Sequence, residues 1–197
     1  MRILPLVAAA VLMAAPMAAQ AAVVSFDGLQ GANGSVFATY SEDGFTVSKT
    51  AGDAFVGQLY GNPLPSIFAG PYYGSASTSL QITAGGETFS FQSWDFGANG
   101  GPANYSISGF LNNVNIFSSG GALSQGAIQT LLSGTNLVFD RLTFDLTSSG
   151  TSMNFDNFAG TISAVPEPAT WAMMIIGFGA VGSMVRASRR RNAFSAA

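Results

Sequence analysis

The sequence predicts an all-β fold, an antiparallel β-sandwich, and three observations lead to this prediction. Charged residues make up only 9% of the 197 residues, and short runs of Phe, Val, Thr and Tyr are typical of β-rich extracellular domains. Apolar and polar residues alternate at period two rather than at the helical period. Turn material rich in Gly, Asn and Ser recurs at short intervals between the alternating segments.

The chain begins with the pattern of a secretory signal. Met1-Arg2 supplies one positive charge, Ile3 to Met13 is a short apolar run, and small residues follow up to Ala19-Gln20-Ala21. A charged start, an apolar core and an A-x-A site are the three parts of a signal peptide. We therefore expect residues 1–21 to be a signal peptide cleaved after Ala21, or close by after Ala22. An uncleaved membrane anchor is the alternative, although the apolar run is short for a full span.

The strands of the sandwich are expected within residues 22–163. Phe89 and Phe91 alternate with polar residues, and Trp94 and Phe96 resume the alternation out of phase, which indicates a bulge near Gln92-Ser93. The pattern also places three apolar residues of each of two segments on one face. The first set is Tyr105, Ile107 and Gly109, and the second set is Leu142, Phe144 and Leu146. Other strand candidates are residues 23–26, 44–47, 80–83, 114–117, 137–139 and 153–162.

Eight or nine strands in about 140 residues, separated by short turns, are the pattern of an antiparallel sandwich, and a jelly roll is our first choice. Turns are expected at 43–44, 85–86, 97–102, 112–113, 118–121 and 148–150. Residues 121–132 are the only candidate for a short helix in this domain.

The last part of the chain, residues 164–197, combines three features in order. Pro166-Glu167-Pro168 is followed by an uncharged segment, residues 169–185, and then by Arg186, Arg189, Arg190 and Arg191. As a helix the uncharged segment is about 25 Å long, just enough to cross a bilayer core. Trp171 stands at one boundary, and the arginines are expected on the cytoplasmic side. We therefore predict a transmembrane helix at residues 169–185 with the acidic domain outside.

This tail resembles the PEP-CTERM sorting signal, in the variant with Trp171-Ala172 after Pro-Glu-Pro. The resemblance implies recognition by an exosortase, a membrane-embedded enzyme similar to a cysteine transpeptidase. It implies cleavage near Pro166-Glu167-Pro168, with release or transfer to the outer envelope. It also implies a Gram-negative bacterium, commonly one that makes exopolysaccharide. An ordinary single-span tail anchor is the alternative, because a span and a charge asymmetry alone would fit it too.

The middle of the chain resembles the galactose-binding-like domains that often precede such tails. Three features carry the resemblance: Ser25-Phe26-Asp27-Gly28, a Phe-x-Phe strand before Trp94-Asp95-Phe96-Gly97, and Asn154-Phe155-Asp156-Asn157-Phe158. A jelly-roll β-sandwich is the fold that this resemblance implies.

Composition excludes several kinds of chemistry. The chain has no Cys and no His, so disulfides, thiolate metal sites, cysteine nucleophiles and His-dependent triads are ruled out. Residues 22–165 hold nine acidic and two basic residues, a net charge of −7. Nucleic acid is thus not an expected partner, because phosphate binding needs a basic face. No spacing pairs two of the acids for general acid–base work, and we predict that the protein is not an enzyme.

Two binding hypotheses remain, and neither involves an organic cofactor. If the first and last strands are neighbours, Asp27 comes close to Asp156, and the two could hold a structural calcium ion, which prefers oxygen ligands. The alternative is that Asp156 and Asn157 only cap a turn. Tyr60, Tyr72 and Tyr73, in a stretch with three prolines, are candidates for a sugar-binding platform, since aromatic faces suit apolar ring surfaces. Trp94 is the fourth aromatic candidate, but its flanking Phe residues favour a place in the core.

Three functions follow from these features. The first is a structural or adhesive protein of the envelope or extracellular matrix, anchored in the inner membrane and then processed by an exosortase. The second is a carbohydrate-binding module acting on exopolysaccharide, and the third an exported hydrolase that uses carboxylates alone. The absence of His and Cys argues against the third without excluding a glycosidase.

Overall fold

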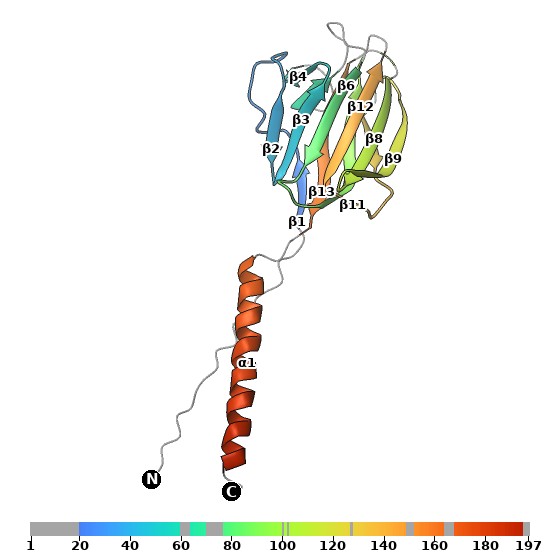
Figure 1. The fold of residues 1–197 in the computed structure, drawn as a ribbon. Helices are drawn as coiled ribbons and strands as arrows, with labels where there is room; N and C mark the ends of the chain where they lie inside the picture. The colour runs from blue at the N-terminus through green and yellow to red at the C-terminus, as the bar shows by residue number, and fades with distance from the viewer. Residues whose placement is uncertain are drawn as a thin grey trace. The chain divides into compact units, whose positions relative to one another are not determined.

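The structure is a computed structural model that describes residues 20–59, 64–69, 77–99, 101, 103–126, 128–148, 152–163 and 168–194. Thirteen strands and one helix lie within these residues. Figure 1 draws the strands as arrows and the helix as a coiled ribbon. The strands are β1 (Gln20–Val24), β2 (Thr39–Glu42), β3 (Phe45–Ala51), β4 (Ala54–Gly57), β5 (Ser66–Ala69), β6 (Ser77–Thr83), β7 (Phe89–Ala98), β8 (Ala103–Leu111), β9 (Val114–Leu123), β10 (Ile128–Leu132), β11 (Val138–Phe139), β12 (Arg141–Ser148) and β13 (Met153–Ile162). The helix is α1 (Pro168–Phe194).

The strands form two antiparallel sheets that pack as a sandwich, so the predicted jelly-roll-like fold class is confirmed. One sheet has seven strands in the order β10-β7-β13-β5-β4, with β1 added beside β13 and β11 beside β7. The other has six strands in the order β2-β3-β6-β12-β8-β9, and it faces the viewer in Figure 1. The first strand, β1, pairs with the last, β13, from Gln20 opposite Ile162 to Val24 opposite Phe158. The expected neighbourhood of the first and last strands is therefore confirmed.

Aromatic side chains fill the space between the sheets. Ten phenylalanines and Trp94 are buried, together with aliphatic residues from both sheets. Trp94 is 1% exposed, and its ring centroid lies 5.2 Å from those of Phe144 and Phe158. Each large aromatic ring removes 150–250 Å² from water, so this core explains how a domain with so few charges and no disulfide holds together.

The phase slip in β7 is the predicted bulge. Phe89 and Phe91 are buried on one side of the slip, Trp94 and Phe96 on the other, while Gln92 is exposed. The partner strand shows the same irregularity, because the register jumps between Asp156 and Gly160 of β13. In β12, Leu142, Phe144 and Leu146 are buried and the residues between them face outward, as predicted.

Two expectations for the middle of the domain were wrong. Residues 118–121 are not a turn but part of β9, where β8 supplies a full antiparallel partner from Ala103 to Leu111. Residues 121–132 are not a helix: they contain the end of β9 and the strand β10, which pairs with β7. Pairing with a neighbouring strand satisfies the backbone of Ser- and Gly-rich segments whose own strand propensity is low. The strands β2, β4 and β5 were not predicted at all.

The chain divides into two units, which are described separately. The strands belong to one unit, Ala19–Ala164, and α1 belongs to the other. The predicted strand domain of residues 22–163 falls inside the first unit. Ala21, the residue before the predicted signal cleavage, lies in β1 opposite Thr161, whereas Ala19 lies outside the described residues.

Candidate functional site

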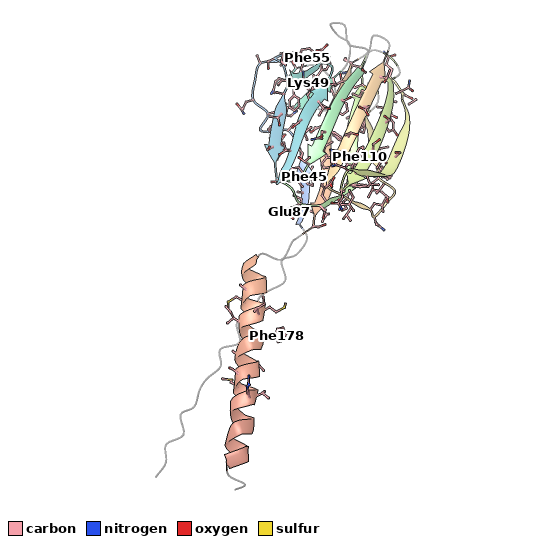
Figure 2. All side chains as sticks on the ribbon, in the orientation of Figure 1. Phe45, Lys49, Phe55, Glu87, Phe110 and Phe178 are labelled. Carbon is pink, nitrogen blue, oxygen red and sulfur yellow. The ribbon has the colours of Figure 1, made fainter. Side chains whose placement is uncertain are left out.

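The sorting tail contributes a single long helix. α1 begins at Pro168, and proline is favoured at the first helical position because its ring sets the helical φ and the missing N–H has no partner there anyway. Trp171 and Ala172 lie in the first turns, and Arg186, Arg189, Arg190 and Arg191 in the last ones. Ala172 to Arg186 are exposed, including Phe178, which Figure 2 labels. Pro166 and Glu167 lie outside the described residues.

The predicted helix at residues 169–185 is confirmed as a helix, but its membrane span is not. Within the described part of the chain, no helix combines the length and the hydropathy that a membrane crossing needs.

The second candidate site is the outer face of the seven-stranded sheet. Phe96, Phe155 and Ile67 point into the core and are buried, so their neighbours along each strand point outward. Cross-strand pairing aligns these neighbours in two adjacent rows. The first row is Gly97, Asn154, Phe68 and Phe55, and the second row is Thr130, Asp95 and Asp156.

The first row joins an aromatic pair to a buried amide. The rings of Phe55 and Phe68 are half-buried, with centroids 6.4 Å apart, and Figure 2 labels Phe55 near one end of the sandwich. The Asn154 side chain is fully buried although it belongs to the outer face. Its Nδ2 donates to Ser66 Oγ at 2.5 Å, and its Oδ1 accepts from Asn99 Nδ2. These partners compensate for the removal of the amide from water.

The second row brings two carboxylates together. Asp95 and Asp156 stand directly opposite each other on β7 and β13. Asp95 accepts hydrogen bonds from Thr130 Oγ1 at 2.6 Å and from Asn157 Nδ2 at 3.1 Å. Asp156 is only 5% exposed and accepts from the Asn157 backbone N–H at 2.7 Å.

The surroundings of Asp156 favour its neutral form. Burial raises the pKa of its carboxyl to about 7, the Asn157 N–H opposes the rise, and the charges of Asp27, Asp95 and Glu42 add to it. Two like charges side by side disfavour each other's ionisation. The charge of Asp156 therefore changes near neutral pH.

A tight turn positions Asp27 on the other side of β13. The carboxylate of Glu42 accepts from the backbone N–H groups of Ser25 and Phe26, at 2.7 and 3.0 Å. Phe26 takes a positive φ of 58° there, and the Leu29 N–H closes the turn on the Phe26 carbonyl. Asp27 then lies close enough to Asp156 to influence its charge, as the calcium hypothesis required.

The structure does not confirm the other predicted binding sites. Among the residues that the structure describes, no group of three or more acids could hold a metal ion, so calcium at Asp27 and Asp156 stays a hypothesis. Tyr60, Tyr72 and Tyr73 lie outside the described residues. Trp94 belongs to the core, as its flanking phenylalanines indicated.

Sequence reasoning missed Asp95, Asn154, Phe55 and Phe68 as residues of this outer face. A signal was present for Asn154: it alternates with the buried Phe155, so it had to face outward on the same strand as Asp156. The positions of Phe55 and Phe68 depend on β4 and β5, whose pairing no local pattern revealed.

Comparisons with known proteins agree with the two parts of the chain. The model of the PEP-CTERM protein-sorting motif matches residues 164–191, so the predicted resemblance of the tail is confirmed. A variant of CBM29-2, a family 29 carbohydrate-binding module, is 15% identical, with a TM-score of 0.45 over 73% of this chain and 93% of that chain. The family 32 module of C. perfringens NanJ in complex with galactose is 16% identical, with a TM-score of 0.43 over 60% of this chain and 97% of that chain.

At these identities and TM-scores the similarity assigns neither a family nor a function to this chain. No curated protein matches the sequence. The sorting motif marks an exported protein that is anchored at the membrane before an exosortase processes it.

Proposed function

We propose that this exported protein is a non-catalytic adhesin of the cell envelope or extracellular matrix, which binds exopolysaccharide through the outer face of the seven-stranded sheet. The observation that carries the proposal is the pair of outer rows. A half-buried aromatic pair, Phe55 and Phe68, lies at the end of one row, and the partly exposed carboxylate of Asp95 lies in the adjacent row. Aromatic faces pack on the apolar faces of sugar rings, and carboxylate groups bind the hydroxyls.

The negative charge of the domain favours neutral sugars as the ligand. The charges of Asp27 and Asp95 act on Asp156 at this face, and residues 22–165 carry a net charge of −7. A polyanionic polysaccharide would be repelled. The exosortase remains the partner implied by the tail, and the outer envelope or the extracellular matrix is the destination that we propose for the processed protein.

Affinity electrophoresis of the protein in gels containing neutral or anionic polysaccharides tests this function. We expect at least one neutral polysaccharide to retard the protein and the anionic ones not to do so. A protein that migrates freely in every neutral gel would leave a purely structural role as the better explanation.

The carboxylate pair favours one second candidate, an exported hydrolase. A carboxyl with a pKa of about 7 beside a second carboxyl is an arrangement found in acid–base catalysis. Sugar release from a retained polysaccharide, lost in both Asp95→Asn and Asp156→Asn, would identify a hydrolase; retention without sugar release identifies the binding module.

A further inference from the structure

The two edges of the six-stranded sheet differ in length and in charge. The edge strand β2 has four residues and carries Glu42, with Asp43 next to it. The opposite edge strand, β9, has ten residues, eight of them exposed, and no charged residue and no proline. Figure 1 shows the two strands at opposite edges of the front sheet. Short strands and charges are the usual protection of a sheet edge, and β9 has neither.

One side of β9 is an open row of backbone groups. The strand pairs with β8 from Val114 to Leu123, with one bulge at Ile116, and no other strand among the described residues pairs with it. Each edge strand presents unpaired N–H and C=O groups to an incoming strand. A second strand could therefore add to the sheet here without displacing anything in the described structure.

Apolar side chains gather around the same edge. Phe117 of β9 contacts Phe139 of β11, with ring centroids 5.7 Å apart, so the β9 edge and the β10–β11 edge of the other sheet lie on one side of the sandwich. Among the described residues outside α1, six of the ten exposed large hydrophobic residues belong to this side. They are Val114, Ile116, Ile128, Leu132, Leu137 and Val138.

Charge indicates what the edge binds. No charged residue occurs from Phe96 to Phe139, while the remaining parts of the domain carry its nine acids. Two copies of so acidic a domain repel each other when other surfaces meet, but not at this edge. We propose that β9 pairs with β9 of a second copy of this chain, antiparallel across a two-fold axis, and joins two six-stranded sheets into one.

The two-fold axis makes the geometry specific. In such a pair each contact occurs twice. The centre of Val114–Leu123 falls between Ser118 and Ser119, which are both exposed, so Ser118 of one copy would face Ser119 of the other. Asn115, nearer one end, would instead face Ala122 of the other copy.

The absence of cysteine from the chain allows a clean test by disulfide trapping. The full-length chain is purified in detergent with single substitutions Ser118→Cys, Ser119→Cys, Asn115→Cys or the control Ser41→Cys on the β2 edge, and treated with a mild oxidant. We expect a mixture of the Ser118→Cys and Ser119→Cys proteins to give roughly tenfold more linked dimer than Asn115→Cys or Ser41→Cys alone, because only complementary positions meet across the axis. Mixing Asn115→Cys with Ala122→Cys protein should restore linkage.

A charge variant provides a second, independent measurement. Ser119→Lys should lower the dimer fraction in sedimentation velocity, whereas the matched edge variant Ser41→Lys should leave it unchanged. Equal linkage at Ser41 and at the β9 positions, or a dimer fraction unaffected by Ser119→Lys, would overturn the proposal. A monomer at all concentrations would overturn it as well. None of these outcomes bears on sugar binding, which uses the other sheet.

Discussion

Asp156 of β13 stands directly opposite Asp95 of β7, on the outer face of the seven-stranded sheet. Like charges at directly opposed positions of an antiparallel pair destabilise a sheet. Here the conflict is lessened in two ways: Asp95 accepts two side-chain hydrogen bonds, and the pKa of Asp156 is raised to about 7. The pair therefore couples the stability of the domain to pH.

The first prediction concerns that coupling. The raised pKa means that the folded state keeps a proton on Asp156 up to about pH 7, whereas the unfolded chain releases it near 3.8. The stabilisation is therefore fully present below pH 3.8 and is lost as the pH rises through 7. We expect Asp156→Asn to raise the free energy of unfolding at pH 8 by at most about 4 kcal/mol. The melting temperature at pH 8 should rise with it. The substitution should also make the melting temperature less dependent on pH between pH 5 and pH 8.

The exposed turn residue provides the control for this experiment. Asp43→Asn should change neither the melting temperature nor its pH dependence, because Asp43 is exposed and Asn is well tolerated at its positive φ. A melting temperature at pH 8 that falls in Asp156→Asn would show that the charged form is the stabilising one.

The second prediction concerns calcium at Asp27 and Asp156. A ligand that binds only the folded state stabilises it, so millimolar calcium should raise the melting temperature at pH 8 and a chelator should lower it again. Asp27→Asn should abolish the response without the pH effect of Asp156→Asn. Identical melting curves with calcium and with chelator would contradict the calcium hypothesis. Protonation of Asp156 would then be what reduces the repulsion between the two carboxylates.

The third prediction concerns the sugar-binding face. Phe68→Ala removes one ring of the aromatic pair and should weaken binding to a retained neutral polysaccharide by about tenfold, or roughly 1.4 kcal/mol. Phe110→Ala is the matched control, since Phe110 is a half-buried ring on the other sheet, beneath the Arg141 guanidinium at 4.4 Å. Figure 2 labels Phe110 on the front sheet. Equal losses in both variants would place the binding site elsewhere.

The fourth prediction concerns the contact between Gly109 of β8 and Phe139. A Cβ atom at Gly109 would lie 2.3 Å from Phe139 Cε1, and Phe139 is fully buried. The ring would have to move, and overpacking of this kind costs about 1–3 kcal/mol. Gly109→Ala should lower the melting temperature by several degrees. Ser108→Ala, at the next position on the outer face, should not; comparable melting temperatures for the two variants would refute the close contact.

The fifth prediction concerns the tail. Replacing Pro166, Glu167 and Pro168 by Ala should leave the longer form uncleaved at the membrane, whereas neutralising the four arginines should weaken orientation and retention, because positive charge biases topology. Immunoblots of membrane and extracellular fractions distinguish the two. Wild-type processing and release of the triple-Ala protein would contradict a role for this motif in sorting.

Several features of the sandwich were predictable because they are local. Alternation within β12, the bulge in β7 and the place of Trp94 in the core follow from side-chain period, since a strand buries every second residue. The sorting motif is likewise contiguous, from Pro166 to Arg191, and its order could be read directly.

Pairing partners were not predictable in this way. The segment of Ser118–Gly121 has the composition of a turn, and it becomes a strand only because β8 lies beside it. The helix at residues 169–185, in contrast, was predicted from a contiguous uncharged run, and α1 confirms it as a helix. The error at residues 118–121 came from judging a segment by its own composition.

The sequence alone determined the β class, the charge-free stretch, the acidic balance and the sorting tail, because each depends on which residues are present and on their spacing along the chain. Only the tertiary structure decided that Asp95 faces Asp156, that Phe55 lies beside Phe68, and that β9 is an edge. These are contacts between segments far apart in sequence, and they depend on strand order and register, which no local pattern specifies.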